Sequence, residues 1–181
     1  MPFRFKALAI PDLVLVEPTV FSDDRGVFLE TFKTTDFKQA CLPAHFVQDN
    51  LSCSKKDVIR GLHYQKNPKA QGKLISVVSG RVWDVAVDIR KSSPTYLKWV
   101  AIELDGEKHQ MVYIPPGFAH GFLAMTDDVL LHYKCTEEYD QAAEAGICWN
   151  DPDIGIPWPA QTPLISERDR LLPDSRHAEV F

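Results

Sequence analysis

Two histidines lie in short segments that also contain glycine. His63 lies in the segment Arg60–Gln65, and His120 lies in the segment Gly117–Phe122. An imidazole has an unperturbed pKa close to neutrality, so it is well suited to take up and release protons at physiological pH. If both segments are strands of one barrel, both imidazoles are able to face its interior.

The residues next to His63 give an expectation for the space around it. Strand alternation predicts that Arg60 lies on the face opposite His63, and that Gly61 shares the face of His63. A glycine at that position is expected to leave open space beside the imidazole, where a ligand has room to approach.

Two inward-facing histidines raise the question of a bound metal ion. A metal site on neighbouring strands needs three or four N/O ligands that converge, such as a His-x-His pair with a carboxylate soon after it. Gln65 occupies the second position of that pattern after His63, and no Asp or Glu follows within reach. We therefore expect no metal and no other cofactor. The chemistry left for such a histidine is general acid–base catalysis, which contributes about 10²–10⁴-fold.

Three further groups are candidates to support a histidine base. A carboxylate fixes the tautomer of such a base, and both Asp169 and Asp84 are candidates between which the spacing does not choose. Lys73 follows a loop and precedes an apolar run, a place from which a cation can hold an oxyanion. Tyr133 lies in another apolar run, and a phenol that faces a cavity is able to donate a proton.

Short strands must position these side chains. Apolar runs rich in β-branched and aromatic residues recur about every ten positions between turn residues, which is typical of an antiparallel all-β protein. A jelly-roll sandwich or barrel is favoured, because such a fold protects the edges of the sheets that so many short strands form. The expected strands are Leu13–Glu17, Val27–Phe32, Phe46–Ser52, Ile59–Tyr64, Leu74–Val78, Val82–Ile89, Ala101–Leu104, Met111–Ile114, Gly121–Ala124 and Val129–Cys135.

The run Val82–Ile89 predicts a strand with two unlike faces. Val85 and Val87 belong to a thick apolar face, whereas Asp84 and Ala86 belong to a narrower face that can admit a ligand. The residues 149–159 are rich in Pro and Asp, so an extended C-terminal segment is expected to wrap the barrel.

One short helix is expected at Thr35–Cys41, with Thr35 as its cap and with Phe37 and Cys41 on one face. The length of 181 residues corresponds to a single domain, residues 1–181.

Composition narrows the classes of partner. The formal net charge is −5, whereas a surface for nucleic acid or anionic lipid needs a field of Lys and Arg. No run of about 18 apolar residues occurs, and Arg4 and Lys6 interrupt the N-terminal segment, so neither a membrane span nor a signal peptide is expected. The four cysteines are too widely spaced for a Cys-x-x-Cys site. We expect a cytoplasmic protein that binds neither nucleic acid nor membrane.

Motifs along almost the whole chain carry a resemblance. The sequence resembles the dTDP-4-dehydrorhamnose 3,5-epimerase family of cupin-fold isomerases. The matching segments are Phe21–Glu30, Val47–Asn50, Arg60–His63, Ala70–Leu74, Asp84–Arg90, Ile114–Phe122, Tyr133–Thr136, Trp149–Pro152 and Gly155–Pro159. The resemblance implies a cupin jelly roll, or double-stranded β-helix, with a few short helices and an extended C-terminal segment.

The resemblance also implies an activity. It implies a metal-free homodimer that converts dTDP-4-dehydro-6-deoxy-D-glucose to dTDP-4-dehydro-L-rhamnose, a step in dTDP-L-rhamnose biosynthesis. By the same resemblance His63 is the base, oriented by Asp169, and Tyr133 is the acid on the other ring face. Lys73 stabilises the enolate oxygen at C4.

The family's substrate-binding residues fall on further positions of this sequence, and Tyr139 matches an aromatic residue that stacks on thymine. Arg168 stands where the family usually has Lys, which keeps the charge but changes the geometry. The matching positions are Arg25, Glu30, Gln48, Asn50, Arg60, His120, Tyr139, Glu144 and Arg168.

Other functions remain open at this point. A relative that epimerises C3 or C5 alone, or a 3,4-ketoisomerase, would share most of these residues, and product analysis by NMR would separate them. A metal-dependent cupin oxygenase is a different class that a metal assay would expose. A non-catalytic sugar-nucleotide binding module is disfavoured because His63, Lys73, Tyr133 and Asp169 occur together.

Overall fold

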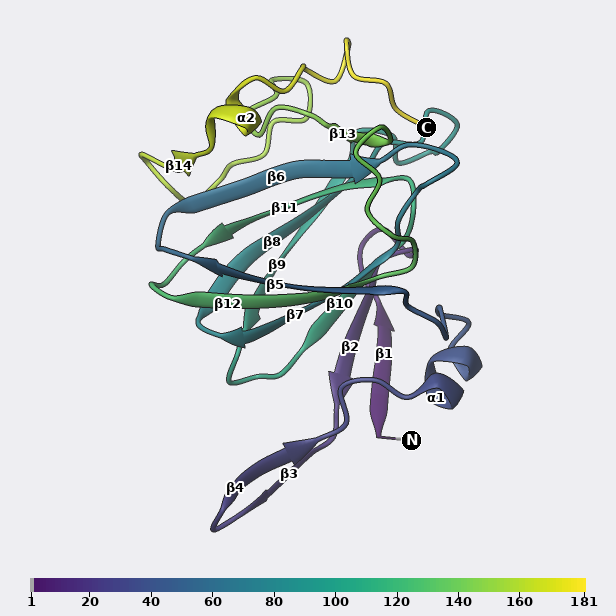
Figure 1. Ribbon diagram of the computed structural model, residues 1–181, viewed down its shortest axis with the longest axis vertical. Coiled ribbons are helices and arrows are strands. Elements are labelled where there is room, and N and C mark those ends of the chain that lie inside the picture. Colours follow the sequence, from purple (N-terminus) through teal and green to yellow (C-terminus); the bar gives the residue numbers. More distant parts are fainter. Residues whose placement is uncertain (1) are drawn as a thin grey trace.

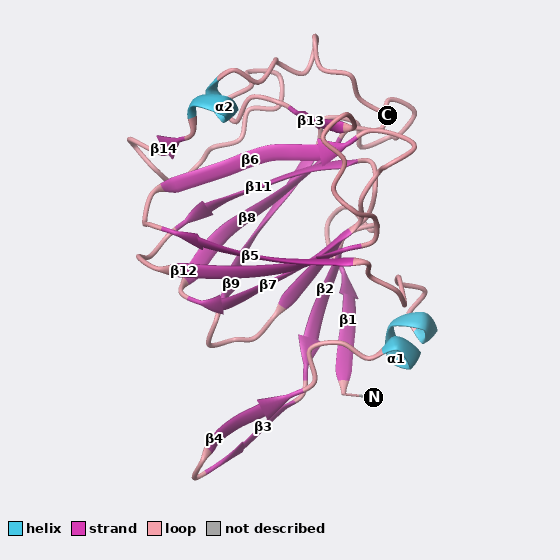
Figure 2. Ribbon diagram, in the orientation of Figure 1, coloured by secondary structure: helices cyan, strands magenta, loops and turns pink. Residues whose placement is uncertain are grey.

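The computed structural model describes residues 2–181, which consist mainly of strands joined by loops (Figure 2). The strands are β1 (Phe3–Ala7), β2 (Val14–Pro18), β3 (Val20–Asp23), β4 (Gly26–Leu29), β5 (Gln48–Ser54), β6 (Val58–Gln65), β7 (Lys73–Ser79), β8 (Arg81–Asp88), β9 (Trp99–Asp105), β10 (Met111–Ile114), β11 (Phe118–Ala124), β12 (Val129–Cys135), β13 (Glu144–Gly146) and β14 (Leu164–Ile165). The helices are α1 (Thr34–Gln39) and α2 (Glu167–Arg170).

Two mainly antiparallel sheets face each other across the core (Figure 1). One has the order β1-β2-β10-β7-β12-β5, and the other has the order β13-β6-β11-β8-β9 with β14 paired in parallel to β6. The main core between them combines residues of both sheets, such as Ile75 and Leu131 with Val82 and Phe122. The predicted all-β, cupin-like jelly roll is confirmed. Both helices among residues 2–181 fall well short of the length and apolarity that a membrane crossing requires.

Strand β8 has apolar side chains on both faces because both faces are covered. Val82 and Ala86 face the core between the sheets. Val85 and Val87 face outward, where Trp158 of the C-terminal segment is part of the same apolar cluster. The predicted two faces of this strand and the wrapping C-terminal segment are both confirmed.

The predicted strand Val27–Phe32 is wrong in extent and in its place in the fold. Strand β4 ends at Leu29 and pairs with β3 in a separate two-stranded sheet. Figure 1 shows this hairpin projecting from the barrel, on the opposite side from α2. Strand β1 was not predicted, although Phe3 and Phe5 alternate with Arg4 and Lys6 in the pattern of a half-buried strand.

The predicted short helix exists, but its bounds and its N-cap differ from the prediction. Helix α1 spans Thr34–Gln39, its N-cap is Lys33, and no side chain caps it. Phe37 is fully buried against the first sheet, as expected, but Cys41 is exposed and lies beyond the helix. The burial of Phe37, and not a capping side chain, therefore stabilises this helix.

The prediction that Arg60 and His63 face opposite sides is wrong, because strand β6 contains a bulge. His63 pairs with His120, whereas Arg60 pairs with Phe122, so three steps along β6 match two steps along β11. One extra residue reverses the alternation, and Arg60 and His63 both turn inward.

Gly61 does not provide open space for a ligand, contrary to the expectation. A Cβ atom at this position would lie 2.5 Å from the Cα of Gly121 on β11, and its φ of +137° favours glycine. Gly61 instead lets two backbones approach closely at the bulge.

Candidate active site

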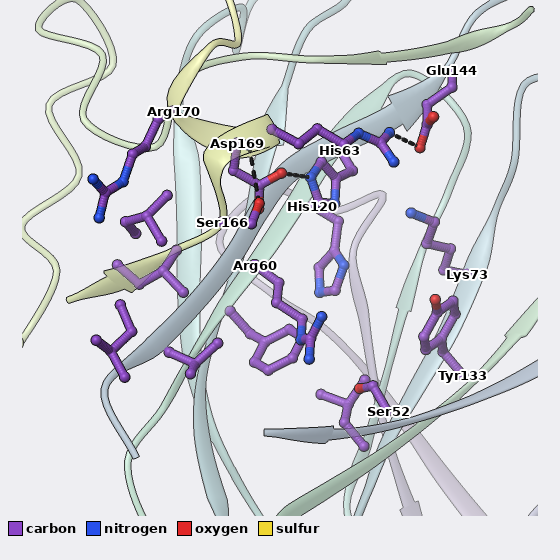
Figure 3. A pocket seen from close by; sticks show the side chains of 17 residues that line it. Ser52, Arg60, His63, Lys73, His120, Tyr133, Glu144, Ser166, Asp169 and Arg170 are labelled. Carbon is purple, nitrogen blue, oxygen red and sulfur yellow. Dashed lines mark hydrogen bonds and ion pairs between the residues drawn. The ribbon is translucent and has the colours of Figure 1, made fainter. Parts of the chain in front are cut away.

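A cavity of about 670 Å³ opens between the two sheets and contains most of the predicted site residues (Figure 3). One wall comes from β6 and β11, and the opposite wall comes from β5, β7 and β12. The C-terminal segment with β14 and α2 lies at its rim. The predicted residues that line it are Arg60, His63, Lys73, His120, Tyr133, Glu144, Arg168 and Asp169.

His63 and Asp169 form a hydrogen-bonded pair. The Nε2 atom of His63 lies 2.7 Å from Asp169 Oδ1, and the other carboxylate oxygen of Asp169 accepts a longer hydrogen bond, 3.4 Å, from the Gly61 amide. Ser166 caps α2 by accepting a hydrogen bond of 3.0 Å from the backbone N–H of Asp169, which holds this residue in place.

The charge of Asp169 determines which nitrogen of His63 can act as a base. Burial raises the pKa of Asp169, but the hydrogen bond from His63 and the other donors outweigh burial, so its pKa lies below the ordinary value. The ionised carboxylate only accepts hydrogen bonds, so Nε2 carries a proton and Nδ1 is left as the basic nitrogen.

His120 forms a second pair of the same kind, with Asp84 of β8. Its Nε2 atom lies 2.8 Å from Asp84 Oδ2, and both side chains are buried. The two carboxylates between which the sequence did not choose therefore serve different histidines. Because His120 and His63 are register partners on neighbouring strands, the two imidazoles are neighbours in one wall of the cavity.

Lys73 and Tyr133 lie across the cavity from His63 (Figure 3). Burial lowers the pKa of Lys73, although the nearby Cys135, Asp84 and Glu144 act in the opposite direction. No acidic side chain among residues 2–181 lies within 4.0 Å of its ammonium group. Lys73 thus has no ion-pair partner among these residues, and its amine is free to meet an anionic ligand in the cavity.

Burial also raises the pKa of Tyr133 above its usual range, and the nearby Arg60 offsets this only in part. Its phenol therefore keeps its proton at neutral pH. A protonated phenol opposite a basic imidazole can supply a proton to the face of a ligand that the base does not reach.

A smaller cavity of about 310 Å³ adjoins the first and shares His63, Lys73, Tyr133 and Glu144 with it. The remaining predicted residues on this side form a chain of hydrogen bonds. Gln48 donates to Asn50 over 3.0 Å and accepts from the Tyr139 amide over 2.7 Å.

The hydrogen-bond chain continues through Tyr139. Its hydroxyl donates to Glu144 over 2.9 Å, and Glu144 in turn forms an ion pair with Arg168. The residue Tyr139 is 52 % exposed, so its aromatic side chain is accessible to a flat ligand.

Arg60 is fixed by its neighbours on β5. Its Nε atom donates to Ser54 Oγ over 3.0 Å, and Nη2 donates to the Cys53 carbonyl over 3.2 Å. Sequence reasoning did not identify Ser54, because a serine in a strand gives no signal of its partner.

Ser166, which positions Asp169, was also not identified. It had a readable signal, since Ser followed three residues later by Asp is a helix N-terminal pattern.

Two predicted residues are not brought to the cavity within one chain. The Arg25 side chain is 90 % exposed at the tip of the β3–β4 hairpin, where it pairs with Asp23 over 2.5 Å. Glu30 follows the hairpin and lies 3.8 Å from Lys33. The hairpin that carries Arg25 projects from the barrel (Figure 1).

The cavity groups are suited to moving protons. Residues 2–181 contain no cluster of three or more His, Cys, Asp and Glu side chains placed to hold a metal ion. The cavity instead combines imidazole–carboxylate pairs, a half-buried lysine and a protonated phenol, each with a different environment. Fold and site together define an acid–base enzyme built on a cupin-like barrel.

Comparison with known proteins identifies the family. The dTDP-4-dehydrorhamnose 3,5-epimerase profile matches residues 7–176. The dTDP-4-dehydrorhamnose 3,5-epimerase of Methanothermobacter thermautotrophicus is 47% identical over 182 residues, which cover 99% of this chain and 98% of that protein. This chain belongs to the dTDP-4-dehydrorhamnose 3,5-epimerase family, as the resemblance indicated.

Solved structures agree with this assignment. The dTDP-4-dehydrorhamnose 3,5-epimerase of Sulfolobus tokodaii is 48% identical and superposes with a TM-score of 0.94, covering 100% of this chain and 99% of that one. The dTDP-6-deoxy-D-glucose-3,5-epimerase of Legionella pneumophila, solved in complex with dTDP-4-keto-L-rhamnose, is 40% identical with a TM-score of 0.93, covering 97% and 94%.

Proposed function

We propose that this enzyme inverts C3 and C5 of dTDP-4-dehydro-6-deoxy-D-glucose and forms dTDP-4-dehydro-L-rhamnose, a precursor for dTDP-L-rhamnose. The observation that carries the proposal is the placement of His63, paired with Asp169, across the cavity from Lys73 and Tyr133. The ligand in the Legionella structure, dTDP-4-keto-L-rhamnose, supports the same substrate class.

The proposed reaction is two rounds of proton exchange next to a ketone. Nδ1 of His63 takes the proton from C3 or C5, and the electron pair of the broken C–H bond moves into an enolate whose negative charge develops on O4. Lys73 stabilises that oxygen. The negative charge that develops on O4 favours the protonated, positively charged form of the lysine beside it. Tyr133 then delivers its proton to the opposite face of the same carbon. The protonated His63 releases its proton to solvent and the phenolate regains one, so both groups are reset for the second carbon.

Nucleotide binding is proposed to use the remaining predicted residues. The guanidinium of Arg60 is held ready for a phosphate oxygen. Tyr139 offers a ring face to thymine, and the residues hydrogen-bonded around it offer polar groups to the nucleoside: Gln48, Asn50, Glu144 and Arg168. His120 contacts the hexose.

The proposal is tested with purified protein and dTDP-4-dehydro-6-deoxy-glucose in D₂O. We expect deuterium at both C3 and C5 and the L-rhamno product by NMR. Deuterium at one carbon only would indicate a monofunctional epimerase, and a product with its ketone moved to C3 would indicate a ketoisomerase. The free 4-keto-6-deoxy sugar is the control, and equal turnover of this sugar would refute the sugar-nucleotide assignment.

The enzyme is further proposed to act as a homodimer in which Arg25 and Glu30 serve the cavity of the partner. The β3–β4 hairpin exposes Phe21, Val27 and Phe28, with exposed fractions of 56 %, 56 % and 67 %. Apolar side chains gathered on a projecting hairpin are typical of a protein–protein contact. Because the hairpin projects from its own barrel, a second copy offers it a binding surface.

Mixing two inactive variants tests this arrangement. Arg25→Ala damages the residue supplied by one chain, and His63→Asn damages the base of the other. If Arg25 acts across the dimer, refolding the two variants together restores activity, because one of the two sites in each mixed dimer contains both native residues. Each variant refolded alone is the control. Mixed dimers without restored activity would show that Arg25 and His63 act in the same chain.

A cytoplasmic location is also proposed. Cys41, Cys53, Cys135 and Cys148 are all free, and two of them are exposed. Exposed free thiols are typical of a reducing compartment.

A further inference from the structure

Asp84 is a carboxylate buried inside the barrel. It lies on the inner face of β8 with an exposed fraction of 1 %, among apolar residues such as Val82 and Ala86. Carboxylates are almost never buried this deeply unless they are paired. The partner of Asp84 is His120, whose Nε2 atom lies 2.8 Å from Asp84 Oδ2.

The pair determines which atom His120 offers to a ligand. An ionised carboxylate has no proton to give, so Nε2 of His120 is the protonated nitrogen and Nδ1 is the nitrogen left for other contacts. Without the carboxylate, the imidazole is able to turn about its broad χ2 torsion and present either nitrogen in either tautomer. Fixing the imidazole ring affects ligand binding only where the ligand must meet one particular ring nitrogen as donor or acceptor.

His120 is in a position where this matters. It lines the cavity, and it is the register partner of His63 on the neighbouring strand. Figure 3 shows it in the wall opposite Lys73 and Tyr133. A hexose bound between the two walls meets Nδ1 of His120 next to the base.

We propose that Asp84 is a positioning residue of the epimerisation. It holds His120 in the Nε2–H tautomer, with Nδ1 available to an oxygen of the hexose, so that the ring binds in an orientation in which His63 reaches C3 and C5. The inference depends on the proposed function, because a hexose must occupy the cavity. Asp84 itself does not touch the substrate and acts through His120.

A double-mutant cycle tests whether Asp84 acts through His120. Asp84→Asn removes the charge with little change in shape, and His120→Ala removes the imidazole. We expect each to lower kcat/KM by roughly 10–100-fold, the range for a charge-assisted hydrogen bond. The double variant Asp84→Asn/His120→Ala is expected to be no worse than His120→Ala alone. Losses that multiply in the double variant would overturn the proposal.

Two measurements separate positioning from a general loss of structure. Affinity for dTDP should remain within about twofold in Asp84→Asn, because the proposed nucleotide contacts lie elsewhere in the cavity. The ¹⁵N NMR spectrum should show His120 as the Nε2–H tautomer in the native enzyme and as a mixture in Asp84→Asn. An unchanged tautomer in the variant would overturn the proposal.

The NMR measurement also keeps the inference separate from the proposed function. If the native enzyme fails to epimerise the dTDP-4-keto sugar, the proposed function falls, whereas the tautomer of His120 still reports what Asp84 does. If Asp84→Asn does not fold, the native spectrum decides, and an Nδ1–H tautomer at His120 would refute the role given to Asp84.

Discussion

His63→Asn is expected to abolish deuterium incorporation at both C3 and C5 of the dTDP-4-keto sugar. The variant keeps a polar side chain next to Asp169 but has no basic nitrogen to take the carbon-bound proton. Since one base serves both carbons in the proposed mechanism, both exchanges should fall together, by about 10²–10⁴-fold. The measurement is ¹H NMR of the substrate in D₂O over time.

His132→Asn is the matched control for this prediction. His132 lies on β12 between two cavity-lining residues, but its own side chain is near Ser76 and does not line the cavity, so its loss should leave exchange unchanged. Wild-type exchange in His63→Asn would show that another group is the base. Loss of exchange at one carbon only would mean that the second carbon has a base of its own.

Tyr133→Phe is expected to separate exchange from inversion. The base remains, so the C–H bonds still open and deuterium still enters from the side of His63. The phenol that supplies the opposite face is gone, so formation of the L-rhamno product should fall by about 10²–10⁴-fold. Deuterium incorporation and product formation can be followed in the same NMR sample.

Tyr113→Phe is the control for Tyr133→Phe. Tyr113 is buried outside the cavity, and burial raises its pKa to about 12, so the change removes a similar phenol from a place without substrate. Inversion should continue in this control. If Tyr133→Phe loses exchange and inversion equally, Tyr133 maintains the shape of the site and is not the acid.

The fold could be predicted from the sequence wherever the pattern within one segment determines which of its side chains are buried. Strand β8 is an example, because the alternation of its side chains predicted its two faces, while the Pro- and Asp-rich composition of residues 149–159 predicted the covering segment. The candidate chemistry was also readable, since His63, Lys73, Tyr133 and Asp169 do come together.

Features that depend on pairing between distant segments could not be predicted. The position of Arg60 follows from an extra residue in β6 relative to β11. The alternation of side chains within β6 alone does not reveal this extra residue. The assignment of Asp84 to His120 and of Asp169 to His63 likewise depends on which strand and helix approach each imidazole. The segment Val27–Phe32 was predicted as a strand, but its pairing with β3 in a separate two-stranded sheet is not contained in its own pattern.

The origin of Asp169 has a consequence for the order in which activity appears during folding. The walls of the barrel come from earlier parts of the chain, whereas Asp169 is carried by α2, in the C-terminal segment that covers the outside. During synthesis N-terminal parts of a chain fold first. A nascent barrel can therefore already hold His63, Lys73 and Tyr133 while the proposed base, His63, still lacks its orienting carboxylate. On the proposed mechanism, catalytic competence therefore requires the docking of the segment that carries α2.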